Sequence, residues 1–265
     1  MGTNRPQTIL FITGAFITSG CWDEWKVYFE TKGYKTLAPS WPHKDATAEV
    51  LRNRQPDALV ASNRLAALVD YYAGVIKQLP HQPILIGHSI GGLIVQLLLQ
   101  RGLGALGAAI HPVPPQGIFT FKLSFIKAGW GALGFFTPVK QSYLMSYRAW
   151  QYGFTNGMDD EKQKDYYYRF AIPKSKLIVR DTITKAAKIN FKIPRPPLLI
   201  ISGSSDHSIP ASLNYSNFSK YRNNHSVTDY KEFAGHNHFV FGRSTWKENA
   251  DYIFEWIGRQ VVAMG

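Results

Sequence analysis

Hydrophobic positions in this chain alternate between short continuous apolar runs and longer stretches with helical spacing. Short runs bounded by glycine, proline or polar clusters are typical of strands buried on both faces, whereas apolar residues recurring every three or four positions are typical of amphipathic helices. Six segments are predicted as strands by the first pattern: 7–13, 34–42, 83–88, 102–111, 196–206 and 226–235. Five segments are predicted as helices by the second: 21–33, 62–79, 90–101, 211–221 and 245–262.

The order of these segments indicates the fold class. Predicted strands alternate with predicted helices and no hairpin signals lie between them, so the connections must cross over a parallel sheet. We therefore expect an α/β fold with a doubly wound, mostly parallel sheet of about six or more strands. Residues 43–61 (HKDATAEVLRNRQPDALVA) show no clear period and are predicted as an irregular polar excursion.

The alternation breaks at Pro112 and resumes after residue 192. The intervening segment has helix-like stretches dense in aromatic residues, which predicts an inserted helical cap at 112–192 on a core formed by 1–111 and 193–265. Most of these aromatic side chains would hold the core of the insert, but those facing the sheet would line an apolar pocket. The pocket candidates are Phe16, Trp130, Phe135, Phe136, Tyr147 and Trp150.

Composition adds a strongly basic balance to this picture. The 265 residues suit one large domain, and the formal net charge is +12. Residues 120–195 contain 14 Lys or Arg against 5 Asp or Glu, an excess of 14 − 5 = 9. This excess is either a solvated surface or a positive rim that attracts an anionic substrate or an acidic surface. The sequence contains no nucleic-acid recognition module, so we expect no nucleic-acid partner.

Cysteine content and hydropathy bear on localisation. A single cysteine, Cys21, excludes an internal disulfide. Residues 5–21 weakly resemble a lipoprotein signal, but Gly14 interrupts the apolar run and Thr18 stands where such sites usually carry leucine. There is no purely apolar run long enough to span a membrane. We therefore expect a cytoplasmic protein without a membrane span; the oligomeric state is not predicted.

The segment PILIGHSIGGLIVQLLLQ, residues 83–100, carries the clearest chemical signal. Gly87, Ser89 and Gly91 fit the pattern G-x-S-x-G, in which a serine sits on a strained turn between a strand and a helix. The pattern alone is common by chance. Its position between a predicted buried strand and a predicted helix favours Ser89 as a nucleophile over an ordinary strand-helix connection.

A serine nucleophile requires a base and a group that orients the base. The predicted strand at 196–206 ends at Asp206, and the loop after the last predicted strand contains His236 and His238. The order serine, acid, histidine is the one that this architecture requires. His236 competes with His238 as the base. An H-x-H zinc site is an alternative, but it lacks a convincing third ligand.

These motifs resemble the α/β-hydrolase fold superfamily over essentially the whole chain. The chain is similar to a bacterial group of capped α/β hydrolases in CWDEW after the first strand, PSWP after the second, GHSIGG at the elbow, and RGLGALGAAIHPVPPQGI leading into the cap. In that family the catalytic histidine directly precedes an aromatic residue, which here implies His238 before Phe239. His236, His207 and His225 are then expected to be structural residues.

The resemblance also implies an oxyanion hole formed by the backbone N–H groups of Ala15 and Ile90. The chain departs from the common family pattern here, because Thr13 and Gly14 stand where His-Gly is frequent. Because the expected donor is a main-chain group, it survives this change.

The function implied is a serine hydrolase, most simply a carboxylic-ester hydrolase that acts on a small apolar acyl substrate, with an anionic substrate as a variant, and that needs no cofactor and no metal. Lactone, amide or carbon–carbon bond hydrolysis and acyl or peroxy transfer could use the same triad. Dehalogenase chemistry is disfavoured because that group uses aspartate at the position of Ser89. A catalytically silent ligand-binding protein is the alternative from another class.

Overall fold

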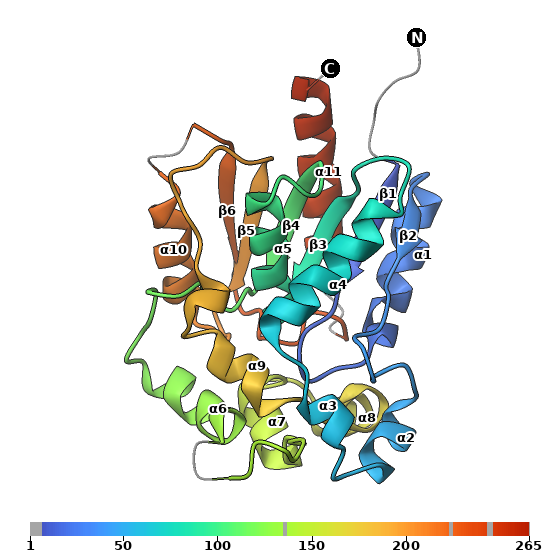
Figure 1. The fold of residues 1–265 in the computed structure, drawn as a ribbon, viewed down its shortest axis with the longest axis vertical. Helices are drawn as coiled ribbons and strands as arrows, with labels where there is room; N and C mark the ends of the chain where they lie inside the picture. Colours follow the sequence, from blue (N-terminus) through green and yellow to red (C-terminus); the bar gives the residue numbers. More distant parts are fainter. Residues whose placement is uncertain (1–6, 135–136, 223–224, 243–245, 265) are drawn as a thin grey trace.

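Six parallel strands form the centre of the molecule. The computed structural model describes residues 7–134, 137–222, 225–242 and 246–264. The strands are β1 (Thr8–Ile12), β2 (Lys35–Leu37), β3 (Ile84–His88), β4 (Leu106–Ile110), β5 (Leu198–Gly203) and β6 (Thr228–Phe233). The sheet order is β2-β1-β3-β4-β5-β6 (Figure 1), and every neighbouring pair is parallel. In the central strands Ile9 lies opposite Ile84 and Ile86 opposite Ala108. The predicted α/β fold class is confirmed.

The two faces of the sheet pack into two separate hydrophobic cores. In β1, Ile9 and Phe11 join one core while Leu10 and Ile12 join the other, because successive side chains of a strand point to opposite faces. The first core is completed by α1 (Asp23–Thr31) and α11 (Trp246–Met264). The second is completed by α4 (Leu65–Lys77), α5 (Ile90–Gln100) and the end of α10 (Ala211–Lys220). Burial on both faces explains the continuous apolar runs of the central strands.

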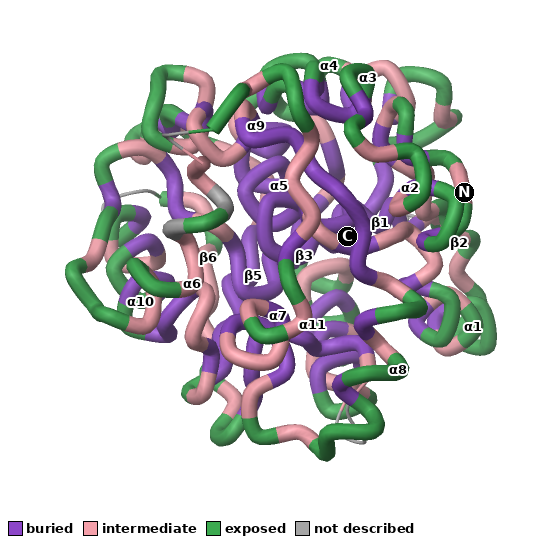
Figure 2. The backbone as a smooth tube through the Cα atoms, turned by 90° about the horizontal axis from the view of Figure 1, so that it is seen from below, coloured by how far each residue is buried: buried purple, intermediate pink, exposed green. Residues whose placement is uncertain are grey.

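The segment between β4 and β5 carries four helices near the carboxyl ends of the strands (Figure 1). They are α6 (Leu123–Leu133), α7 (Tyr147–Gly153), α8 (Asp160–Phe170) and α9 (Lys176–Asp181). The described chain also contains two short 3-10 helices, η1 (Ser19–Trp22) and η2 (Lys185–Ala187). Figure 2 looks onto this edge, with the buried tube of β3, β5 and α5 in the middle of the view.

Residues 43–61, predicted to be irregular, contain two short helices that join the same layer. These are α2 (Ala48–Asn53) and α3 (Ala58–Ala61), and each begins at a side-chain cap, where Thr47 and Asp57 accept from backbone N–H groups. Arg52 Nε donates to the carbonyl oxygen of Ala171 after α8 at 2.8 Å. Helices this short contain too few turns to produce a detectable period, so the prediction missed them.

Within the described residues, no helix has both the length and the apolar character needed to cross a membrane.

Close backbone contacts place Ser89 between β3 and α5. Ser89 has φ 57° and ψ −118°, a conformation that side-chain-bearing residues rarely adopt. A Cβ at Gly91 would lie 2.0 Å from the carbonyl oxygen of Ile12, and one at Gly87 would lie 2.3 Å from the carbonyl oxygen of Gly91. These positions therefore need glycine so that α5 can start against β1 and β3.

We predict that Gly91→Ala lowers the free energy of unfolding by about 2 kcal/mol or more, because the added methyl group overlaps backbone atoms that cannot move aside. Urea denaturation measures the change. Gly74→Ala in α4 is the matched control: its Cβ would meet no atom within 4 Å, so it should stabilise the helix by about 0.5 to 1 kcal/mol. Equal effects of the two substitutions would contradict the close approach.

Candidate active site

Three side chains from the carboxyl edge of the sheet form a continuous hydrogen-bond chain. Ser89 follows β3, Asp206 follows β5, and His238 lies in the loop after β6. His238 Nε2 lies 3.1 Å from Ser89 Oγ, and His238 Nδ1 lies 2.8 Å from Asp206 Oδ2. All three residues are buried. With the proton on Nδ1, Nε2 is free to accept the proton of the serine hydroxyl.

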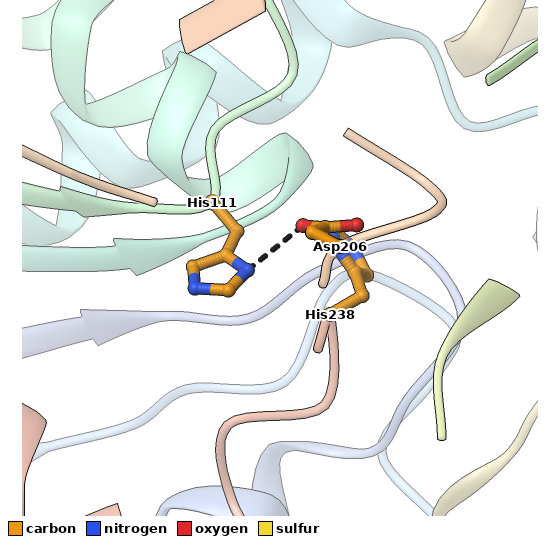
Figure 3. A group of neighbouring side chains, drawn as sticks. All are labelled: His111, Asp206 and His238. Carbon is orange, nitrogen blue, oxygen red and sulfur yellow. Dashed lines mark hydrogen bonds and ion pairs between the residues drawn. The ribbon is translucent and has the colours of Figure 1, made fainter. Parts of the chain in front are cut away.

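Asp206 also binds a second histidine, which was not predicted from the sequence. His111, directly after β4, donates from Nδ1 to the same Asp206 Oδ2 at 2.8 Å (Figure 3). The other carboxylate oxygen, Oδ1, accepts from the backbone N–H of Ile209 at 2.8 Å. The buried carboxylate is therefore held by three donors, which offset much of the cost of removing its charge from water.

The electrostatics of this cluster keep the carboxylate of Asp206 charged and lower the pKa values of His111 and His88. Burial alone would raise the pKa of Asp206, but the charge and hydrogen bonds of His238 and His111 lower that pKa well below its usual range. Burial lowers the pKa of His111, an effect that its bond to Asp206 only partly offsets. Burial, and then the nearby His238, lower the pKa of His88 still further.

One imidazole nitrogen or carboxylate oxygen from each of His111, Asp206 and His238 lies within 4.8 Å of the others, a spacing that is also found in metal sites. In the structure both Nδ1 atoms point at one carboxylate oxygen, and His238 Nε2 points at Ser89. Hydrogen bonds thus account for the imidazole nitrogens that face Asp206.

His236 points away from this cluster. Its ring stacks on Phe233 with the centroids 5.0 Å apart, Asn249 Nδ2 lies 3.1 Å from its Nδ1, and Glu248 lies 3.4 Å from its Nε2. The His236 ring contacts β6 and α11, whereas the His238 ring contacts Ser89 and Asp206. The two histidines therefore do not form an H-x-H metal pair. His236 instead links the loop after β6 to α11.

The loop after β1 lies against the nucleophile. A Cβ at Gly14 would lie 3.2 Å from Cβ of Ser89, and Ala15 and Ile90, the predicted oxyanion donors, are both buried beside it. Within the described chain neither the Ala15 nor the Ile90 amide donates to a backbone carbonyl.

Three contacts hold this loop in the absence of the His-Gly pair. Trp22 Nε1 donates to Thr13 Oγ1 at 3.1 Å, and the backbone N–H of Ile172 donates to the carbonyl oxygen of Phe16 at 2.8 Å. Lys44 Nζ donates to the carbonyl oxygen of Ala15 at 2.6 Å and lies 4.5 Å from the ring centroid of Trp41 in the PSWP motif. Burial lowers the pKa of Lys44 to about 7.

An apolar cavity of about 290 Å³ opens beside Ser89 and His238. One wall comes from the core, with Ile90, Ser208 and Ile209, and the other from the inserted segment, with Val113, α6 and the residues around α9. The further lining residues from the inserted segment are Phe125, Ile126, Ala128, Gly129, Leu133, Met145, Phe154, Val179, Thr182 and Ile183. Among the described lining residues there is no Lys, Arg, Asp or Glu.

A family model described as the alpha/beta hydrolase family matches residues 9–251. The chain belongs to this family. Membership in the alpha/beta hydrolase family supports a hydrolase that acts on a small-molecule substrate. A comparison with curated proteins found no match.

Solved structures similar to this alpha/beta hydrolase include three with hydrolase names. A monoacylglycerol lipase from Paleococcus ferrophilus is 19% identical, with a TM-score of 0.64 over 97% of this chain and 96% of that one. An extracellular alpha/beta-hydrolase from a Paenibacillus species is 18% identical, with a TM-score of 0.66 over 94% and 98%. A pyrethroid hydrolase from Sphingobium faniae is 16% identical, with a TM-score of 0.64 over 95% and 97%. At these identities the likeness shows the fold.

The predicted pocket residues have different places in the structure. Phe16 lines the cavity. Trp150 is fully buried, stacked on Phe154, and Tyr147 bonds to Asp160 at its hydroxyl; neither lines the cavity. These two aromatic residues hold the inserted segment together instead. The side chain of Trp130 and residues 135–136 lie outside the described part of the chain.

His88, His111 and Lys44 were not predicted from the sequence as site residues. His88 is the residue before Ser89, and its Nε2 lies 2.8 Å from the carbonyl oxygen of His238. His111 directly follows a predicted strand, so its place at the carboxyl edge of the sheet was a usable signal. Nothing in the local sequence around Lys44 indicates that its side chain reaches the loop after β1.

We predict that the protein loses stability as the pH falls from about 7 to about 5. His88 and His111 have lowered pKa values when folded, so the unfolded chain binds more protons in this range and the free energy of unfolding rises with pH. His111→Asn should flatten this slope, because Asn can keep a donor near Asp206 but does not titrate. Urea denaturation at several pH values measures it.

The control is His81→Asn, which removes an exposed imidazole and should leave the slope unchanged. A His111→Asn slope as steep as that of the natural sequence would show that His111 does not contribute to the pH dependence.

Proposed function

We propose that this alpha/beta hydrolase is a carboxylic-ester hydrolase that works through an acyl-enzyme on Ser89. The observation that carries the proposal is the hydrogen-bond chain from Ser89 through His238 to Asp206 at the mouth of an apolar cavity. This is the arrangement that nucleophilic acyl transfer requires, with a base on the hydroxyl and an acid that orients the base.

In the proposed reaction His238 Nε2 takes the proton of Ser89 as Oγ attacks the ester carbonyl carbon. Asp206 stabilises the imidazolium that forms, and the N–H groups of Ala15 and Ile90 donate to the oxyanion. His238 then gives its proton to the leaving alcohol. Water enters by the same route, loses its proton to His238, and releases the acid while Ser89 is regenerated.

The position of Ile90 supports its role. It is the first residue of α5, so its N–H points out of the helix and the helix dipole adds partial positive charge there. The three anchors on Thr13, Ala15 and Phe16 support the role of the opposite loop.

The cavity favours a neutral, modest apolar acyl group. Its volume of about 290 Å³ lies at the small end of ligand pockets, and its described lining offers no cation to an acyl group that carries a charge. An anionic substrate would have to carry its charge on the part that stays outside. We propose that residues 112–192 act as the cap over this cavity, on the core of 1–111 and 193–265.

Lactone, amide and carbon–carbon bond hydrolysis and acyl or peroxy transfer use the same proposed groups and remain alternatives within the enzyme class. The alternative from another class is a silent ligand-binding protein. It gives no reason for a base within 3.1 Å of a serine held in a strained conformation.

The central test is covalent labelling. A fluorophosphonate probe should label the protein at Ser89 and abolish hydrolysis of short-chain nitrophenyl esters, and Ser89→Ala should lose both labelling and several orders of magnitude in kcat. Mass spectrometry locates the adduct, and a continuous absorbance assay measures the rate.

Ser216→Ala is the matched control, because Ser216 is exposed on α10, away from the residues that line the cavity, and its hydroxyl bonds to the carbonyl oxygen of Ser212. It should keep both labelling and turnover. A well-folded protein that is neither labelled nor active on any ester of the series would overturn the proposal in favour of ligand binding.

Lys44 supplies a test of the oxyanion loop. We predict that Lys44→Met lowers kcat by roughly ten- to a hundredfold with little change in KM, because the misplaced Ala15 N–H matters most when charge develops on the oxygen. Binding of a boronic acid, which forms a tetrahedral adduct on serine, should weaken in parallel.

Lys26→Met, at an exposed ion pair with Asp23, is the control for loss of a lysine. If Lys44→Met reduces the unfolding midpoint but leaves kcat and boronic acid affinity unchanged, Lys44 has only a structural role.

A further inference from the structure

Large apolar side chains are exposed at the start of α6. Phe119 is 70% exposed, and Phe121 and Leu123 are each 82% exposed. The rings of Phe119 and Phe121 contact each other edge to face, with their centroids 5.8 Å apart. We call residues 119–127 the entrance segment. Exposed apolar side chains gathered in one short segment mark an interaction site on the protein surface.

The inner side of the same helix lines the cavity. Phe125, Ala128 and Gly129 face it, and Ile126, which lines the cavity, is also 41% exposed and borders an outer hollow with Leu123 and Lys127. A helix that is apolar on both sides is normally covered on both sides. The inner side of α6 faces the cavity and the core of the insert. The outer side is exposed to solvent.

The charge around the entrance segment is positive. Lys122 and Lys127 are exposed within it, and Lys127 Nζ lies 4.0 Å from the ring centroid of Tyr152. The sequence contains no Asp or Glu between residues 71 and 158. Acidic side chains near the entrance segment therefore come from other parts of the chain, such as Glu232, which lines the same groove as Lys122. The mixture of apolar and basic groups is the one that binds an anionic lipid surface.

We propose that the entrance segment docks on an anionic lipid surface, with Phe119, Phe121 and Leu123 inserted among the acyl chains and Lys122 and Lys127 against the phosphate groups. An apolar substrate dissolved in that surface would reach the cavity past Ile126. Only this route of entry rests on the proposed esterase function, since docking itself needs no turnover.

A second copy of the chain fits this segment less well. In a twofold pair the same patch meets itself, so Lys122 and Lys127 of one copy would face the same lysines of the other. Repulsion between like charges opposes this pairing, whereas an anionic lipid surface complements both the apolar and the basic groups.

The test is sedimentation with phospholipid vesicles at low ionic strength, using the full chain. The natural sequence should bind vesicles of equal parts phosphatidylcholine and phosphatidylglycerol much more strongly than vesicles of phosphatidylcholine alone. The double variant Phe121→Ser/Leu123→Ser should bind the mixed vesicles at least tenfold more weakly. Lys122→Gln/Lys127→Gln should lose most of the preference for the anionic lipid.

The matched control is Val27→Ser/Val262→Ser, which removes two comparably exposed apolar side chains from α1 and α11 and should leave binding unchanged. Each variant is first shown to keep the unfolding midpoint of the natural sequence. Equal binding by the entrance and control variants would overturn the proposal. So would absence of binding to the mixed vesicles, or a concentration-dependent dimer that only Phe121→Ser/Leu123→Ser abolishes.

Discussion

The approach of α5 to the backbone of β1 is the contact on which the rest of the site depends. Gly91 lies so close to Ile12 that a single methyl group would overlap its carbonyl oxygen. This contact sets where the helix begins, holds Ser89 at positive φ, and brings the loop after β1 beside the serine. The strain at Ser89 is sustained because two buried cores fix the strand and the helix that flank it.

A second constraint is the buried charge of Asp206. A carboxylate without partners would take up a proton at this depth, so the fold supplies donors from three different elements: His111 after β4, Ile209 before α10, and His238 after β6. Because both imidazoles share one oxygen, the position of His238 depends on β4 as well as on β5 and β6. The carboxyl edge of the parallel sheet is the one place where these loops meet.

The segment between β4 and β5, which lies over this edge of the sheet, supplies an apolar environment. The cavity is almost entirely apolar, and most of its wall comes from the segment between β4 and β5. Polar groups of that segment bond outside the cavity. The N–H of Ile172, for example, donates to the loop that carries Ala15. The same segment thus closes the cavity, supports the loop after β1 and presents apolar and basic groups to the outside.

The sequence by itself determined the parallel α/β sheet, because buried strands and amphipathic helices have distinct periods, and it determined the elbow at Ser89, because glycine spacing is a local property. It also placed Asp206 and His238 at the correct edge, since strand ends can be located from apolar runs. Tertiary structure alone decided what surrounds them. His111, Lys44 and the lining of the cavity come from segments far apart in sequence. Tyr147 is half-buried and bonds to Asp160 instead of lining the cavity. Trp150 shows why aromatic content could not identify the pocket: a buried aromatic side chain packs equally well in the core of the insert, and only the fold decides which face it covers.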